Sequence, residues 1–93
     1  MLSKRRLREF WQWHDDATLP LLRWHKLMSC ARYRDFSALR ADFPSADRVE
    51  GLVVFNIGGN KYRLVADVRF DRLLVFVKAV LTHRDYDKGA WKK

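Results

Sequence analysis

The chain has 93 residues, of which 19 are Lys or Arg and 11 are Asp or Glu, so its formal net charge is +8. With 48% hydrophobic residues, a chain of this length can bury one core unaided, which excludes a disordered chain and leaves no room for a second core. We therefore expect one domain over residues 1–93.

Two helices are predicted in the first third of the chain, because apolar residues recur there at helical spacing. Ser3 is the expected N-cap of the first helix, and Asp15 or Asp16 is the expected N-cap of the second. Pro20 fits the second helix only in its first turn, where a backbone N–H is not needed. The residues expected to face the core are Leu7, Phe10, Trp11, His14, Trp24, Leu27, Met28 and Ala31.

A short third helix is predicted after Asp35, whose side chain is suited to an N-cap. Phe36, Leu39 and Phe43 would then face inward. Pro44 ends this helix, because the residue before a proline is disfavoured in the α region.

The second half of the chain has a hydrophobic period of two, which indicates strands. Gly58-Gly59 is a strong signal for a two-residue hairpin loop, since both loop positions need positive φ, and Asp71-Arg72 is a weaker turn signal. We expect an α+β fold, in which N-terminal helices pack on a small antiparallel β-meander. The predicted strands are residues 52–57, 61–70 and 73–83.

The two loops together predict a cluster of polar residues on the sheet face that points away from the core. A Gly58-Gly59 loop places Asn56 opposite Lys61. If the second loop also has two residues, Lys78 lies opposite Val65 and diagonal to Arg63. A slip of one residue in this second hairpin would separate the cluster. Its members are Asn56, Lys61, Arg63 and Lys78.

Each candidate in this cluster also has an ordinary structural explanation. Lys78 lies in an otherwise apolar strand, so it either pairs with Asp67 or faces water. Arg63 is either a solvated strand residue or an anion ligand, because the planar guanidinium matches phosphate oxygens. His83 could exchange a proton near neutral pH, although a single histidine at a strand end usually has no such role.

The positive charge indicates a polyanionic partner, because phosphates supply affinity and aromatic side chains stack on bases. An acidic protein would satisfy the charge equally well. The chain has no GxxxxGK[ST] loop, no GxSxG elbow and no ligand set at metal spacing, so neither a metal nor a cofactor is expected. What remains is metal-free phosphodiester chemistry, or binding alone.

The cysteine content indicates where in the cell the protein is expected. The single Cys30 suits a reducing compartment, because it cannot form a disulfide within the chain. The longest stretch without a charged residue covers residues 52–60, far below the ~20 residues of a membrane helix. The N-terminus carries basic residues but no apolar region that would make it a secretory signal. We expect a soluble cytoplasmic protein without membrane contact.

Two segments of the chain resemble one protein family. The first begins at Asp35 and reads DFSALRADFPSADRVEGLVVFNIGGNKYRLVADVRF, and the second ends at Trp91 and reads VFVKAVLTHRDYDKGAW. Their motifs FNIGGNKYRLVA and THRDYD are similar to those of the HigB toxins of type II toxin–antitoxin systems, in the RelE superfamily. The resemblance implies the RelE-like microbial RNase fold, which agrees with the fold expected from the periodicity.

The resemblance also implies an activity and partners. The activity is that of a ribosome-dependent mRNA interferase, an endoribonuclease that inhibits translation and growth. The partners are mRNA, the ribosome and a HigA-like helix-turn-helix antitoxin, which would bind the toxin in a hetero-oligomer.

Site residues follow from the same resemblance. In this superfamily, basic residues on the sheet and a histidine or tyrosine at its C-terminal end cleave RNA, and members exchange these residue types among the roles. The catalytic residues implied here are Arg63, Lys78, His83 and Tyr86. The residues expected to contact RNA are Asn56, Asn60, Lys61, Arg69, Lys88 and Lys92.

Two other functions are compatible with the sequence. A non-catalytic basic module that binds RNA or an acidic protein would keep the charge and fold and would not depend on His83. A DNA-binding role for the N-terminal helices is less favoured, because Pro20 and the apolar stripe suit the second helix poorly to a DNA groove.

Overall fold

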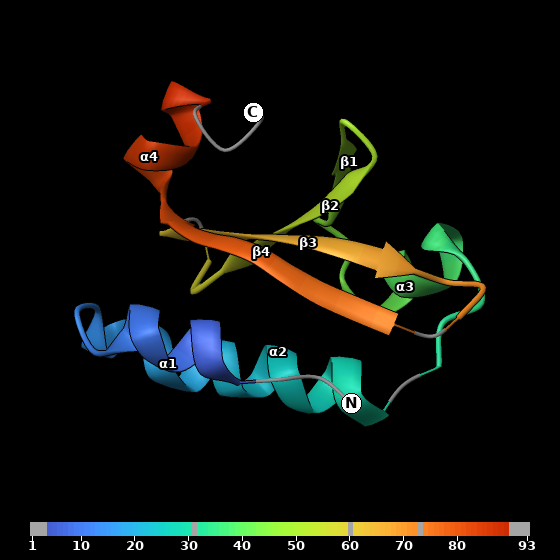
Figure 1. Cartoon of the computed structure of the whole chain (residues 1–93), viewed down its shortest axis with the longest axis horizontal. Coiled ribbons are helices and arrows are strands. Elements are labelled where there is room, and N and C mark those ends of the chain that lie inside the picture. Colours follow the sequence, from blue (N-terminus) through green and yellow to red (C-terminus); the bar gives the residue numbers. More distant parts are fainter. Residues whose placement is uncertain (1–3, 31, 60, 73, 90–93) are drawn as a thin grey trace.

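The computed structural model of the chain describes residues 4–30, 32–59, 61–72 and 74–89. The fold has two main layers, one of helices and one formed by the sheet. Figure 1 shows helices α1 and α2 side by side under one face of a four-stranded sheet, with α4 on the other side of the sheet. The elements in chain order are α1 (Arg5–Trp11), the short 3₁₀ helix η1 (Asp15–Ala17), α2 (Thr18–Cys30), α3 (Phe36–Asp42), β1 (Asp47–Val49), β2 (Leu52–Ile57), β3 (Tyr62–Arg69), β4 (Leu74–Thr82) and α4 (His83–Lys88).

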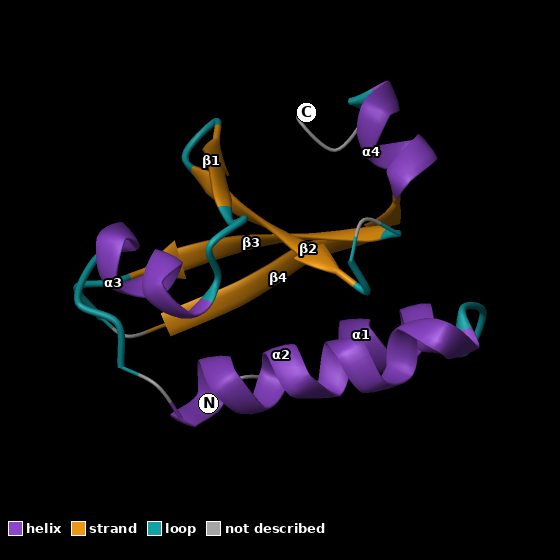
Figure 2. Cartoon of the chain, turned by 180° about the vertical axis from the view of Figure 1, so that it is seen from behind, coloured by secondary structure: helices purple, strands orange, loops and turns teal. Residues whose placement is uncertain are grey.

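All neighbouring strands are antiparallel and follow one another in the order β1-β2-β3-β4. The predicted α+β fold, with helices on an antiparallel meander, is therefore confirmed. β4 is one of the two edge strands, and the view from behind shows that β1 and α4 both stand on the face opposite α1 and α2 (Figure 2). This opposite face is where the candidate site lies.

The core lies between the helices and the sheet. Trp24 of α2 is 2% exposed and meets Phe55 of β2 edge to face, with 5.4 Å between ring centroids. Phe43 contacts the same Phe55 ring at 5.0 Å. The apolar alternation of β2 and β3 produces this core, because side chains on one face of a strand recur every second residue.

Most of the helix predictions are confirmed. The carboxylate of Asp35 accepts a hydrogen bond from the Ala38 N–H at 2.9 Å, so Asp35 is the N-cap of α3. The inward residue Leu39 is fully buried, and α3 ends before Pro44. Pro20 lies in the first turn of α2, where a proline is tolerated.

Three details of the first two helices differ from prediction. Asp16 lies within η1, and its carboxylate contacts β3 instead of capping a helix. His14 follows α1 and is not part of it. Leu27 is 38% exposed, because it lies about 100° around the helix from Met28, which belongs to the buried stripe. The predicted cap Ser3 and the predicted core residue Ala31 lie outside the described residues.

The first long hairpin has a longer loop than predicted. Asn56 pairs with Arg63 and Ile57 with Tyr62, so four residues separate the paired positions instead of two. Both Gly58 and Gly59 have positive φ, as predicted, and the Lys61 N–H donates to the Gly58 carbonyl at 3.4 Å to close the turn. The predicted pairing of Asn56 with Lys61 is wrong by two residues, a shift that leaves the strand residues Asn56 and Arg63 on the same face, as expected.

The second hairpin keeps the predicted register in the half of the ladder next to its turn, from Arg69 to Ala66. Arg69 pairs with Leu74, but a β-bulge at Val65/Ala66 shifts the remaining pairs by one residue. Val65 therefore faces Ala79, and Lys78 has no Cα partner in β3. The predicted position of Lys78 opposite Val65 is wrong for this reason.

The sequence reasoning missed two elements. No strand is predicted before Leu52, but β1 pairs with β2, and Glu50 and Gly51, both with positive φ, form the tight turn that joins them. The segment after Thr82 was expected to continue the strand to His83 and then to be a polar tail, but it forms α4.

Candidate functional site

Arg63 and Tyr86 meet on the sheet face opposite α1 and α2. The Arg63 Cζ lies 5.6 Å from the centroid of the Tyr86 ring, in a cation–π arrangement. Arg63 is half-buried in β3, and its Nη1 donates to the Tyr62 carbonyl at 3.2 Å. Tyr86 is half-buried on α4. A strand residue and a helix residue, both predicted to be catalytic, are thus in contact.

Short-range signals place α4 at this point. The Thr82 hydroxyl accepts from the Asp85 N–H at 3.1 Å and caps the helix, and Gly89 ends it with a φ of 71°. The His83 N–H donates to the Lys61 carbonyl at 3.1 Å, which ties the start of α4 to the start of β3. α4 buries none of its residues. Its position therefore depends on these polar links and on the contact of Tyr86 with Arg63.

His83 is the first residue of α4 and not the end of β4, which corrects its predicted place. His83 and Tyr86 are three positions apart on one helix, a spacing that puts both side chains on the same side. The His83 side chain is 54% exposed, and its Nε2 lies 3.8 Å from the Asp87 carboxylate. Tyr86 is thus packed on the Arg63 guanidinium, and the solvent-exposed His83 side chain lies on the same side of α4 as Tyr86.

Asn56 lies directly across from Arg63 in the β2–β3 pairing. The next pair on the same face is Val54 and Val65, which are 3% and 1% exposed. Arg63 therefore lies next to a buried apolar pair, and a half-buried cation is less screened than one in open water.

Lys61 lies in the hairpin loop and faces the helical layer, so it does not share a face with Arg63. Its Nζ donates to the Asp16 carboxylate at 2.7 Å, and the Tyr62 hydroxyl donates to the same carboxylate at 2.5 Å. The Lys61 ammonium and the Tyr62 hydroxyl lower the pKa of Asp16, and the carboxylate in turn raises the pKa of Tyr62. Asp16 thus holds the two residues that come just before Arg63.

Lys78 and Arg69 lie away from the Arg63–Tyr86 contact. Lys78 is exposed on the edge strand, where the bulge removes it from the predicted place diagonal to Arg63. Arg69 lies six residues along β3 from Arg63, about 20 Å at ~3.3 Å per residue. Its guanidinium contacts both oxygens of Asp67 at 3.0–3.1 Å and lowers the pKa of that carboxyl, with a smaller effect from Lys78.

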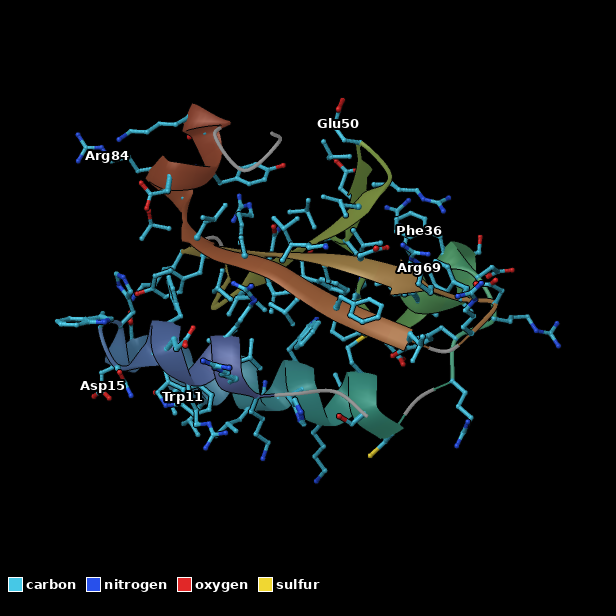
Figure 3. All side chains as sticks on the ribbon, viewed as in Figure 1. Trp11, Asp15, Phe36, Glu50, Arg69 and Arg84 are labelled. Carbon is cyan, nitrogen blue, oxygen red and sulfur yellow. The ribbon has the colours of Figure 1, made fainter. Side chains whose placement is uncertain are left out.

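The other predicted RNA contacts are scattered. Lys88 is exposed in the last turn of α4. Figure 3 shows Arg84 at the α4 end of the molecule and Arg69 near the opposite end. Asn60 and Lys92 lie outside the described residues. The structure therefore brings Arg63 and Tyr86 into contact, with His83 on the same helix as Tyr86 and Asn56 paired across from Arg63.

The sequence reasoning did not assign Asp16 and Thr82 to the site. Asp16 carries no local signal for its role, because its partners are more than forty residues away. Thr82 does carry a signal, because a threonine three residues before an acidic residue is a known start of a helix. Among the described residues, no group of three potential metal ligands gathers, and no helix is long and apolar enough to cross a membrane.

The geometry is suited to an anionic substrate whose reaction requires proton transfer. A guanidinium beside two protic groups can neutralise developing negative charge while an imidazole or phenol moves a proton. A phosphodiester in a single strand of RNA has this chemistry, since its own 2′-hydroxyl lies next to the phosphate.

Comparison with known proteins shows which family the chain resembles. A family model described as HigB_toxin, the RelE-like toxic component of a toxin–antitoxin system, matches residues 17–89. The chain is 43% identical over 53 residues to the mRNA interferase toxin HigB of Escherichia coli (strain K12), which covers 54% of this chain and 51% of that protein.

Further relatives show the same likeness. The mRNA interferase HigB of Shigella flexneri has the same identity over the same length. The mRNA interferase HigB of Escherichia coli O6:H1 (strain CFT073) is 33% identical over 70 residues, or 69% of this chain and 68% of that protein. The chain thus spans about half the length of the first relatives and about two thirds of the last.

Proposed function

The chain belongs to the HigB family of RelE-like toxins, and from this premise we propose that it is an endoribonuclease that cuts mRNA during translation. In this proposal it acts in the cytoplasm, on mRNA held by the ribosome, and a helix-turn-helix antitoxin silences it. The relatives named above are mRNA interferases, which supports the reaction class. The observation that carries the proposal for this chain is the contact of Arg63 with Tyr86 beside His83.

The proposed reaction needs only groups of the RNA and of the chain. The ribose 2′-oxygen attacks the adjacent phosphorus in line, and the bond from phosphorus to the 5′-oxygen breaks. The proton of the 2′-hydroxyl leaves with a base, and a proton is delivered to the departing 5′-oxygen. The products are a 2′,3′-cyclic phosphate and a 5′-hydroxyl.

His83 is the residue that we assign to proton transfer. Its side chain is 54% exposed, so it can reach a bound RNA strand without a rearrangement of the fold. Its backbone N–H is fixed to the Lys61 carbonyl, which sets the origin of the side chain relative to β3. A well-placed general acid or base contributes about 10²- to 10⁴-fold to a rate.

Arg63 is the residue that we assign to the charge that develops on the phosphate. Its guanidinium lies on Tyr86, and Arg63 is half-buried next to the buried Val54–Val65 pair, so water screens it less than a cation at an open surface. Preorganised cations of this kind commonly give the largest single contribution to catalysis. Tyr86 positions the guanidinium with its ring and presents its hydroxyl to the same phosphate.

The first experiment combines growth and product analysis. Expression of the chain should arrest growth, while Arg63→Ala and His83→Ala should both restore growth and remain folded by circular dichroism. Primer extension on mRNA from translating cells should show cuts with the wild type and none with His83→Ala. The cut ends should carry a 2′,3′-cyclic phosphate.

Two results would remove the proposal. If both variants stay toxic, the assigned site is wrong. If the wild type binds RNA but leaves it intact, with or without ribosomes, the chain is a non-catalytic RNA-binding module of the same fold. As a matched control, Arg84→Ala removes an exposed cation from α4 next to His83 and should leave cleavage intact.

A further inference from the structure

A groove separates α1 from the edge strand β4, at some distance from the Arg63–Tyr86 contact. It has a volume of about 420 Å³, and we name it the α1–β4 groove. Its lining includes Arg6, Phe10, Trp13, His14, Lys78 and Val80. The α1 wall comes before residue 17, where the match to the family begins. The α1 wall therefore lies outside the part of the chain that the family model matches.

Trp13 supplies an open aromatic surface in the groove. It is 84% exposed, although tryptophan is a residue that usually buries most of its surface. The backbone beneath it is held firmly, because its N–H donates to the Phe10 carbonyl at 3.1 Å and the His14 ring stacks on Phe10 at 4.4 Å. The backbone of Trp13 is therefore held in place while its indole ring is exposed to solvent, which suits stacking on a planar ligand.

Two cations approach the groove from opposite walls. Arg6 comes from α1 and Lys78 from β4, and both are exposed. In the part of the chain that the structure describes, neither forms an ion pair within 4.0 Å. Glu9 is the one acidic residue of the lining, and Arg5 pairs with it at 3.6 Å. The groove therefore favours an anion.

We propose that the α1–β4 groove binds one nucleotide of single-stranded RNA, with its base stacked on Trp13 and its flanking phosphates on Arg6 and Lys78. An aromatic platform between cations is the usual way in which proteins hold a single strand, because every base has a face to stack and every link has a charge. This inference rests on the proposed function, since it makes the groove the place that holds the substrate near its site of cleavage.

The position of Lys78 links the groove to the site. Lys78 lies three residues before Leu81 on β4, about 10 Å along the strand at ~3.3 Å per residue. Leu81 is the residue that pairs with Arg63 of β3. β4 is an edge strand, so no further strand blocks the way around it from one face of the sheet to the other. The bulge that removes Lys78 from the ladder places it where a strand of RNA can pass from Arg63 around the edge.

The test is equilibrium binding of a short unstructured RNA with 2′-O-methyl riboses, which the chain cannot cut because the nucleophile is blocked. Trp13→Ala should weaken binding about 5- to 150-fold, the usual range for loss of one stacked base. Trp13→Phe should restore most of the affinity. Arg6→Ala and Lys78→Ala should each reduce the dependence of log affinity on log salt by about 0.7.

Matched controls separate the groove from general charge and from folding. Lys26→Ala removes an exposed cation of α2 outside the groove and should leave affinity and salt dependence unchanged. An abasic strand of equal length should bind equally to wild type and Trp13→Ala, because it has no base to stack. Thermal melting should be unchanged by Trp13→Ala, since this side chain is 84% exposed.

Several outcomes would overturn the inference. One is wild-type affinity of Trp13→Ala for the RNA, and another is an equal loss of affinity for the abasic strand. A third is polyglutamate that binds and loses affinity in Trp13→Ala as RNA does, which would assign the groove to an acidic protein. In each case the proposed function survives if Arg63→Ala still abolishes cleavage. If the wild type neither binds nor cuts RNA, both proposals fail together.

Discussion

The guanidinium of Arg63 lies on the ring of Tyr86, with 5.6 Å between Cζ and the ring centroid. This contact joins the middle of the sheet to a helix that buries none of its own residues. A cation–π contact contributes about 0.5–2 kcal/mol, depending on its exposure to water. The position of the Arg63 head group, and with it the proposed chemistry, therefore depends on the Tyr86 ring.

Substitution of Tyr86 should show whether the ring or the hydroxyl matters more. Tyr86→Phe keeps the ring on Arg63 and should retain most of the cleavage rate. Tyr86→Leu loses the ring and should lower the rate about 2- to 30-fold, the equivalent of one cation–π contact. In the Arg63→Ala background, the change to leucine should have little further effect, and an undiminished loss there would show that Tyr86 acts independently of Arg63.

The cap of α4 gives a second prediction. Thr82→Val keeps the β-branched shape but removes the hydroxyl that accepts the Asp85 N–H. The change should cost about 1 kcal/mol of helix stability. Hydrogen exchange should quicken at the N–H groups of α4 with little change in the melting temperature, since α4 has no buried residue of its own, and cleavage should fall. Thr82→Ser retains an acceptor and should behave like the wild type.

The contacts of Asp16 predict a dependence of stability on pH. The pKa of Asp16 is lowered from its ordinary value of 3.8 by Lys61 and Tyr62, so its contribution is present above that value and is lost as pH falls through the lowered pKa. The pKa of Tyr62 is raised above its ordinary 10.0, so its contribution is present below 10 and is lost as pH rises through the raised pKa.

Asp16→Asn should therefore melt at a lower temperature than the wild type, with a constant gap between about pH 5 and pH 9 that narrows towards both extremes. Melting curves across this range measure the gap. Asp15→Asn is the matched control, because it removes the neighbouring carboxylate of the same 3₁₀ helix. A gap that persists unchanged in acid would show that the charge of Asp16 is not its source.

The cap of α3 gives a prediction that does not depend on function. Asp35→Ala removes the acceptor for the Ala38 N–H and should destabilise the protein by about 1 kcal/mol, or roughly 4–8 °C in melting temperature. Asp35→Ser keeps a side-chain acceptor and should lose much less. Equal losses in the two variants would show that the cap contributes little.

Local patterns in the sequence account for much of the fold. The alternation in β2 and the cap at Asp35 depend on neighbours within a few residues, so they could be predicted. The loop after Ile57 could not, because Gly58-Gly59 serves in both two-residue and four-residue turns. The bulge at Val65/Ala66 could not be predicted, because the hydrophobic pattern does not indicate it. It shifts every pair between the bulge and the start of β3 by one residue.

The candidate site was predictable in part for the same physical reason. The family motifs pointed to Arg63, Lys78, His83 and Tyr86, but the structure places Lys78 away from the Arg63–Tyr86 contact, and the register expected from the loop lengths was wrong for both Lys61 and Lys78. The role of Asp16 depends on a contact across the whole fold, and no local pattern encodes such a contact. Long-range polar contacts and small irregularities of the ladder are thus the features that required coordinates.

The bulge at Lys78 also protects the open side of the sheet. An edge strand with nine residues offers a row of free backbone groups to any other extended chain. A local twist that carries a lysine spoils this template, because a second strand would have to bend and to bury the charge. Lys78→Val would thus make the protein more prone to edge-to-edge aggregation, because it removes the charge that a second strand would have to bury.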